Sequence, residues 1–223
     1  MHRWRTGHRV KQRPTPGHPC GITGSVSSSS TAATSTSSGV PNLWDSGPDV
    51  QPGTYQFDFV GTPVTITVPA GWTTFDVHAV DGPDQSYLAF FDVTDVYKDP
   101  CQWVDGRLGI GPSVDDLVAG LQTQPGLKRS IPKPLTVDGF TGVELVFTAD
   151  PTLEFSTCYT GAFAIFVVDQ NYQIGMQTPG EESTAWIMDL NGRRGMINFG
   201  AKAPMTDATR AQVDGMLASL RFG

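Results

Sequence analysis

The sequence has little histidine, little cysteine and no long apolar run. Of its four histidines only His78 lies beyond residue 40, and it contains three cysteines. The longest apolar stretch, residues 162–168, has the length of a strand, whereas a bilayer-spanning helix needs about 20 apolar residues. We therefore expect no membrane span, and few side chains are left for a zinc site or a histidine-activated nucleophile.

Basic residues are also scarce in most of the chain. Five of the 15 Lys and Arg residues lie in positions 1–40, which contain no acidic residue. The remaining 183 residues hold ten basic and 22 acidic side chains, a net charge of −12. Because a polyphosphate chain binds to concentrated basic surface, this composition argues against nucleic acid as a partner.

Composition divides the chain into three parts. Residues 1–24 are basic and predict a disordered N-terminus, and residues 25–42 predict a flexible linker, because residues 25–39 contain eleven Ser or Thr. No apolar core of about 7 to 15 residues follows the basic positions, so an export signal is not recognisable in this stretch. Residues 43–223 are long enough to form a single domain with a sizeable core.

Apolar residues at every second position predict many antiparallel strands. Asn191-Gly192, between the last two of them, is the preferred pair for a type I′ hairpin. The expected strands cover residues 55–59, 64–68, 74–80, 87–93, 135–137, 142–148, 157–168, 172–177, 186–190 and 194–199.

Two amphipathic helices are expected among these strands. Ser113 starts the first, with two acidic residues in its first turn and apolar residues at helical spacing from Val114 to Leu121. This helix should end by Pro125-Gly126. The second covers residues 206–220, with Thr206 as its N-cap. The pattern predicts an α+β domain, in which an antiparallel sheet of about 7 to 9 strands is covered by two main helices.

The three cysteines allow three pairings. Cys101 and Cys158 lie in patterned sequence, whereas Cys20 lies in a segment rich in Pro and Gly. A Cys101–Cys158 disulfide would close a loop of about 60 residues and stabilise the fold by roughly 4 kcal/mol in the chain-entropy description. It predicts an oxidising, extracytoplasmic compartment. The alternative is two buried free thiols that act as small apolar side chains.

Motifs for catalysis, metal or nucleotide binding are absent from the sequence. It has no nucleophile elbow, no closely spaced Cys or His ligands and no P-loop. We therefore predict no catalytic residue, no cofactor and no metal site. Two alternatives stay open, a hydrolase built on His78 and a cation site among acidic residues near the first helix, namely Asp92, Asp95, Asp99 and Asp105.

Four aromatic residues are the candidates for a ligand-facing surface. Aromatic rings supply large contact areas in binding pockets, although they also pack in cores and at sheet edges. The candidates are Trp72, Tyr97, Trp103 and Tyr159.

Five segments carry a resemblance to known families, namely VTITVPAGW (64–72), DPCQW (99–103), GPSVDDLVAGL (111–121), VDGFTG (137–142) and ASLRF (218–222). Together they resemble uncharacterised extracytoplasmic proteins of actinobacteria, many of which carry a Ser/Thr-rich linker behind a lipid anchor or a single membrane span. More distantly, the sequence is similar to PsbP-like domains, which are α/β/α sandwiches around an antiparallel sheet. The resemblance implies that fold and an extracytoplasmic location, and it implies no particular activity.

Together these features predict a non-enzymatic domain, secreted or anchored at the cell surface, that binds a protein, an envelope component or a small ligand. A structural or assembly subunit of an envelope complex is the first alternative. A hydrolase that uses His78 is the second.

Overall fold

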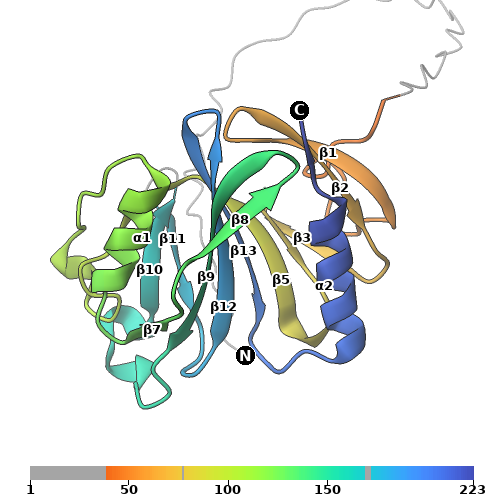
Figure 1. Ribbon diagram of the computed structural model, residues 1–223. Helices are drawn as coiled ribbons and strands as arrows, with labels where there is room; N and C mark the ends of the chain where they lie inside the picture. The colour runs from red at the N-terminus through yellow and green to blue at the C-terminus, as the bar shows by residue number, and fades with distance from the viewer. Residues whose placement is uncertain (1–38, 77, 169–171) are drawn as a thin grey trace, which may run out of the picture. The chain divides into compact units, whose positions relative to one another are not determined.

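An eight-stranded antiparallel sheet runs through the middle of the computed structural model (Figure 1). The structure describes residues 39–76, 78–168 and 172–223, so the expected N-terminus (1–24), most of the expected linker (25–42) and the expected turn at 169–171 lie outside the described residues. In spatial order the strands are β3 (Thr73–Asp76), β4 (Ala79–Asp81), β5 (Ser86–Phe91), β13 (Arg193–Ala201), β12 (Glu182–Leu190), β9 (Phe140–Ala149) and β7 (Leu127–Arg129), with β8 (Lys133–Val137) also paired to β9.

Two three-stranded sheets and two α-helices complete the part that the structure describes. The helices are α1 (Val114–Thr123) and α2 (Asp207–Ser219). One small sheet has the order β1 (Gly53–Phe59), β2 (Thr62–Val68), β14 (Arg221–Phe222), and the other β11 (Tyr172–Met176), β10 (Phe163–Val168), β6 (Val93–Val96). The predicted α+β class, with an antiparallel sheet and two helices, is confirmed.

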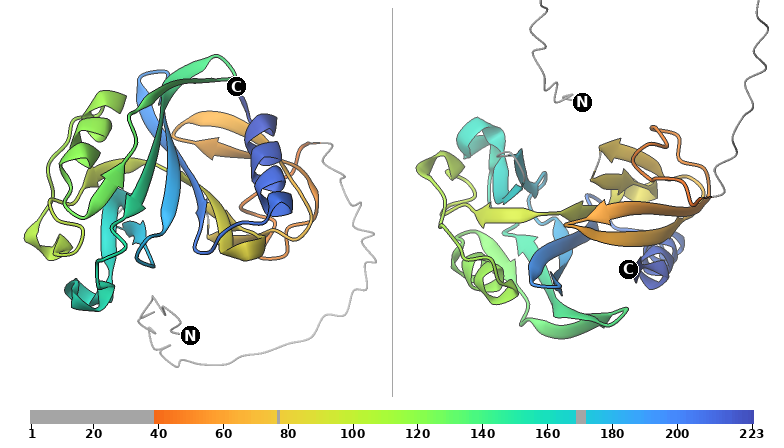
Figure 2. Two further views of the ribbon diagram at one scale, coloured as in Figure 1. Left: turned by 60° about the horizontal axis from the view of Figure 1, so that its bottom comes forward. Right: turned by 90° about the horizontal axis from the view of Figure 1, so that it is seen from above.

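The first core fills one face of the central sheet. Strand β5 contributes Leu88 and Phe90 to it, and the β1–β2 hairpin and α2 cover it. Both views of Figure 2 place α2 beside that hairpin and α1 on the opposite side of the molecule. Side chains that are fully buried here include Leu43, Ile66, Trp72 and Leu88, and each contributes roughly 1.5 to 3 kcal/mol through burial.

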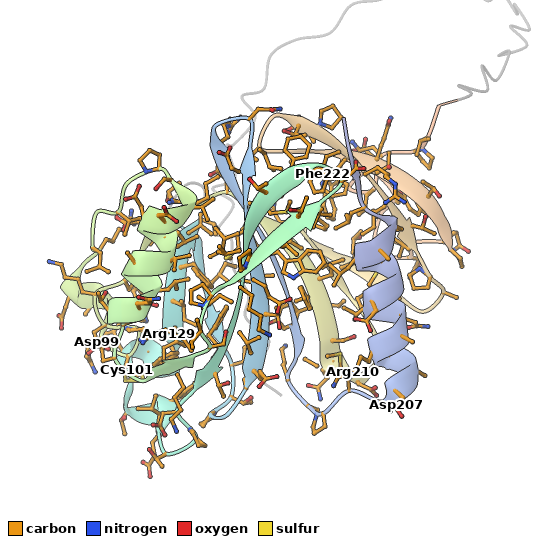
Figure 3. All side chains as sticks on the ribbon, viewed as in Figure 1. Asp99, Cys101, Arg129, Asp207, Arg210 and Phe222 are labelled. Carbon is orange, nitrogen blue, oxygen red and sulfur yellow. A yellow bond between two sulfur atoms is a disulfide. The ribbon has the colours of Figure 1, made fainter. Side chains whose placement is uncertain are left out.

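The second core fills part of the opposite face. Its β5 residues are Ala89 and Phe91, and α1 and strands β6 and β10 cover it. In Figure 3, Cys101 lies on this side of the molecule, whereas Asp207 and Arg210 of α2 lie on the other. Alternation along β5 therefore sends neighbouring side chains into separate cores.

Both helices begin where the sequence predicts. Ser113 Oγ accepts the Asp116 N–H at 3.1 Å, and the Asp116 carboxylate accepts the Ser113 N–H at 2.9 Å, which forms a capping box. Thr206 Oγ1 caps α2 by accepting the Thr209 N–H. A second cap comes from a distant loop, because Asp84 Oδ2 accepts the Thr206 N–H at 2.8 Å. The hydrogen bonds that Asp84 accepts from the Thr206 N–H and from the Thr209 hydroxyl lower the pKa of its carboxyl.

Three expected strands differ from the structure. The stretch 74–80 is not one strand, because β3 and β4 pair antiparallel with Thr74 opposite Val80. Apolar residues alternate through the whole stretch, so the alternation gives no sign that the chain reverses direction between β3 and β4. The stretch 87–93 divides at Asp92 between β5 of the central sheet and β6 of a small sheet. The stretch 157–168 begins with 3₁₀ turns, and its strand starts only at Phe163.

Candidate functional site

The predicted cysteine pair forms a disulfide. The sulfur atoms of Cys101 and Cys158 lie 2.06 Å apart, and the two residues are 57 positions apart in the sequence. The backbone supports this junction, because the Tyr159 N–H donates to the Cys101 carbonyl at 2.8 Å. The disulfide joins the segment before α1 to the segment before β10 and so closes one side of the second core.

Three of the four aromatic candidates lie together beside this disulfide. The ring centroids of Tyr97 and Trp103 are 5.8 Å apart, and those of Trp103 and Tyr159 are 4.8 Å apart. The Trp103 indole N–H donates to the Tyr159 carbonyl at 3.2 Å. Trp72 lies elsewhere, buried in the first core, where its indole N–H donates to Gln212 Oε1.

His78 occupies an exposed turn between β3 and β4. Its ring lies 6.5 Å from that of Phe91, centroid to centroid. Within residues 39–76, 78–168 and 172–223, no serine or cysteine side chain forms a hydrogen bond with this imidazole. A hydrolase built on His78 needs a nucleophile within hydrogen-bond reach of the imidazole, and the described residues lend this alternative no support.

Acidic residues before α1 accept hydrogen bonds from the backbone or form an ion pair. Asp95 Oδ1 accepts the N–H groups of Gly109 and Ile110, and Asp99 Oδ1 accepts that of Cys101 at 2.8 Å. Asp92 pairs with Arg193 at 3.5 Å. No group of three or more His, Cys, Asp or Glu side chains suited to a metal ion occurs among the described residues.

Arg194 of β13 binds the backbone of the segment that leads into α1. Its guanidinium donates to the carbonyl oxygens of Gly111, Ser113 and Val93 at 2.7 to 2.8 Å. Burial lowers the pKa of this group. Residues 99–122, in which Asp, Cys, Trp and Gly crowd before a helix, thus have structural partners for their main polar groups.

A cleft of about 440 Å³ opens on the second face of the central sheet, between strands β4, β5 and β13 and strand β11. Small residues leave this space, because Ala79 and Ala89 lie opposite each other on β4 and β5 and no larger side chain fills the position. Gly175 lines the facing wall on β11. A Cβ atom there would lie 1.9 Å from the Phe163 carbonyl oxygen, so only glycine allows β11 to pair this closely with β10.

Two residues that line the cleft, Tyr87 and Asn198, belong to a network of polar side chains. The Tyr87 hydroxyl lies 2.7 Å from Ser183 Oγ, and Asn198 Nδ2 donates to the same oxygen at 2.7 Å and to the Thr184 carbonyl at 3.1 Å. Burial is the main cause that raises the pKa of the Tyr87 phenol. Tyr87 is therefore neutral at physiological pH and acts as a fixed dipole rather than a base.

Two carboxyl groups and one ammonium group line the same cleft. They belong to Asp81 of β4, Glu181 before β12 and Lys202 after β13. Burial raises the pKa of both carboxyl groups, and the positive charge of Lys202 partly offsets this rise. No ion pair within 4.0 Å joins these three residues to one another or to any other described residue.

Sequence reasoning missed this cleft. Asn198 lies between the apolar residues Ile197 and Phe199 of β13, and that interruption was the available signal. Glu181 follows a Pro-Gly pair and is indistinguishable in the sequence from an exposed loop carboxylate. The strand order β4-β5-β13-β12 brings these residues together.

The described helices include none that combines the length and apolar character needed to cross a membrane. Comparisons of this chain with known protein families, with curated proteins and with solved structures found no match. The resemblance to PsbP-like domains and to actinobacterial extracytoplasmic proteins therefore stays an expectation from the sequence.

Proposed function

We propose that this protein is a non-enzymatic extracytoplasmic binding domain, secreted or anchored at the cell surface, which takes a small ligand into the cleft between β5 and β11. The location rests on the Cys101–Cys158 disulfide, because structural disulfides persist mainly in oxidising compartments. The net charge of −12 beyond residue 40 argues against nucleic acid as the ligand.

The carboxyl group of Glu181 carries the proposal of a ligand site. Glu181 is only 6% exposed and lines the cleft. Its Oε2 accepts the N–H groups of Gln177 and Thr178 at 2.7 and 3.2 Å, and the Thr178 side chain is a further hydrogen-bond partner of this carboxyl. Hydrogen bonds to a charged oxygen are about twice as strong as those between neutral groups, so a ligand that places a donor against this carboxyl gains binding free energy there.

The arrangement favours binding over catalysis. Tyr87 and Ser183 form a hydrogen bond with each other, and Asn198 completes their network. No imidazole among the described residues contacts this serine, and the neutral Tyr87 phenol is a poor base. Tyr87, Ser183 and Asn198 therefore act as neutral hydrogen-bonding groups and do not form an activated nucleophile.

A thermal-shift screen with small polar metabolites and soluble envelope fragments tests this function. A ligand present at about 100 times its Kd stabilises the folded state by roughly 2.7 kcal/mol, which raises the Tm by several degrees. The Ala79→Leu variant, which fills part of the cleft, should lose that shift. Ala218→Leu, at an exposed position of α2 outside the cleft, is the control and should keep it. The proposal fails if no compound shifts the wild type, or if every shift persists in Ala79→Leu.

The aromatic cluster of Tyr97, Trp103 and Tyr159 beside the disulfide favours a second candidate function, that of a structural or assembly subunit. Val104 is 54% exposed and Tyr159 43% exposed, and both lie beside Trp103. Exposed apolar side chains that gather at one place are typical of partner-binding surfaces. A stable partner should then co-purify with the wild type and be lost from Val104→Asp, whereas a cleft variant such as Ala79→Leu should retain it.

A further inference from the structure

Strand β8 has one edge that no described strand covers, because it pairs with β9 alone. The two strands form a hairpin around Asp138-Gly139, whose φ values of 47° and 87° are both positive, as a type I′ turn requires. Such a turn makes Val137 and Phe140 a hydrogen-bonded pair, so every second residue of β8 bonds to β9. The residues in between, Pro134 and Thr136, therefore direct their backbone groups away from β9.

The outward backbone groups of β8 have no partner in the described part of the chain. Thr136 is exposed, and neither its N–H nor its C=O bonds to a described residue outside the hairpin. Pro134 has no N–H, but its carbonyl oxygen is open in the same way. An uncovered edge of this kind is a template for a strand of another chain, and a proline on it restricts the pairing to a short ladder.

A groove of about 380 Å³ lies beside this edge, between β8 and the end of α2. Trp186 of β12 lies opposite Glu144 of β9, which in turn lies opposite Lys133 of β8. Because side chains alternate along a strand, Trp186 shares one face of the sheet with Leu135 and Val137. The apolar lining of the groove consists of Leu135, Val137, Trp186, Leu217, Ala218 and Leu220.

The hairpin that carries the edge is held in place at both ends. At its turn, Asp138 Oδ2 accepts the Phe222 N–H at 2.7 Å, and the rings of Phe140 and Phe222 lie 5.4 Å apart, centroid to centroid (Figure 3). At the start of β8, Lys133 pairs with Glu144 at 3.6 Å. A preformed edge loses little conformational freedom when a peptide pairs with it.

The groove favours a basic side chain over an acidic one. Its charged residues are Asp138, Asp214 and Arg221. Arg221 Nη1 donates to the carbonyl oxygens of Ala218 and Leu220, whereas Asp214 is exposed and has no hydrogen bond or ion pair with a described residue. The negative end of the α2 dipole lies at the same place and adds to the attraction for a cation.

We propose that β8 binds an extended segment of a partner protein, which adds to the central sheet as a further strand. The backbone of the segment bonds to Thr136 and Pro134, an apolar side chain lies over Trp186, and a Lys or Arg side chain pairs with Asp214. In this mode of recognition the backbone bonds supply affinity, and the groove beside the edge supplies specificity. The site shares no lining residue with the cleft between β5 and β11 and does not depend on the small ligand proposed there.

Selection of displayed random heptapeptides on the full chain tests the inference. The enriched peptides should alternate apolar residues with others and carry Lys or Arg. Fluorescence polarisation then measures the Kd of the most enriched peptide and of analogues that are N-methylated at one position each. Methylation should weaken binding about 10-fold at every second position, where an N–H faces β8, and have little effect at the positions between.

Two variants assign the contacts. Thr136→Pro removes the outward N–H and should weaken binding about 10-fold, and the fold accepts proline there because Pro134 already occupies an outward position of the same strand. Asp214→Asn should weaken binding about 2- to 5-fold. Asp45→Asn, at an exposed carboxylate outside the groove, is the matched control and should bind as the wild type does. The unfolding midpoint of each variant separates a binding defect from a folding defect.

Several outcomes would overturn the inference. These are the absence of any enriched peptide, enriched peptides without a basic residue, an N-methylation profile without a period of two, and equal affinity for the wild type and Thr136→Pro. If the wild type sediments as a dimer and Thr136→Pro as a monomer, a second copy of this chain occupies the edge, and the partner segment is wrong. Peptide binding should persist in Ala79→Leu, so this inference and the proposed small-ligand function can fail independently.

Discussion

The first core and the cleft lie on opposite faces of the same strand, β5, and differ in the size of the side chains that cover it. Phe90 points into the first core, where its ring lies 4.7 Å from that of Phe57 and 5.4 Å from that of Phe59, centroid to centroid. Ala89 points to the other face and lies opposite another alanine, Ala79. One face is therefore filled by aromatic rings, while part of the other stays open.

This difference separates stability from binding within one sheet. Large side chains in close contact supply most of the free energy of folding. Small side chains leave room for a ligand and allow polar groups such as Glu181 and Asn198 to face the open space. The opposite face and the rest of the second core stabilise the same strands.

The largest effect is expected from Phe90→Ala. Removal of this ring leaves a cavity among Trp44, Phe57 and Phe59, and the free energy of unfolding should fall by roughly 3 to 5 kcal/mol. Ala79→Leu extends into the open cleft and not into a packed core, so its effect should be smaller, about 1 kcal/mol or less. Denaturant unfolding measures both. An equal loss in the two variants would mean that the two faces are packed alike.

A somewhat smaller loss is expected when the disulfide is removed. The double variant Cys101→Ser with Cys158→Ser should unfold with roughly 2 to 4 kcal/mol less free energy, because its unfolded chain gains freedom. Reductant should lower the stability of the wild type by a similar amount and leave the double variant unchanged. If reductant has no effect on the wild type, the second core does not depend on this cross-link.

The smallest effect concerns the pH dependence of stability. Burial raises the pKa of the Glu181 carboxyl, so the folded state holds this proton more tightly than the unfolded chain. The free energy of unfolding that the protonated carboxyl contributes is fully present below the pKa of the unfolded chain. It is lost as the pH rises through the pKa of the folded state. Burial acts on Asp81 in the same direction, so both carboxyl groups contribute to this loss.

Glu181→Gln removes one of the two contributions. Between about pH 4 and about pH 7, this variant should lose less stability than the wild type, as followed by chemical denaturation at several pH values. The exposed Glu182→Gln is the control and should follow the wild-type curve. A Glu181→Gln curve parallel to that of the wild type would indicate that the cleft does not perturb this carboxyl.

Local sequence patterns determined much of the fold. Ser113 and Thr206 start the helices because a side-chain oxygen satisfies a free N–H of the first turn, which is a local interaction. Asn191 and Gly192 have φ of 58° and 83°, as their type I′ turn requires. The predicted pairing of Cys101 with Cys158 also holds. The caps and the turn depend on neighbouring residues, whereas the cysteine pairing was expected because both cysteines lie in patterned sequence and Cys20 does not.

Only the tertiary structure decided where the chain reverses and what gathers on each face. The stretch 74–80 folds back into β3 and β4 although its apolar alternation is continuous. Asp84 caps α2 across a separation of 122 residues in the sequence. The cleft depends on sheet order, which places Asp81, Tyr87 and Asn198 on adjacent strands and leaves two alanines side by side. Such long-range placement leaves no local pattern, because each residue taken alone fits an ordinary strand or loop.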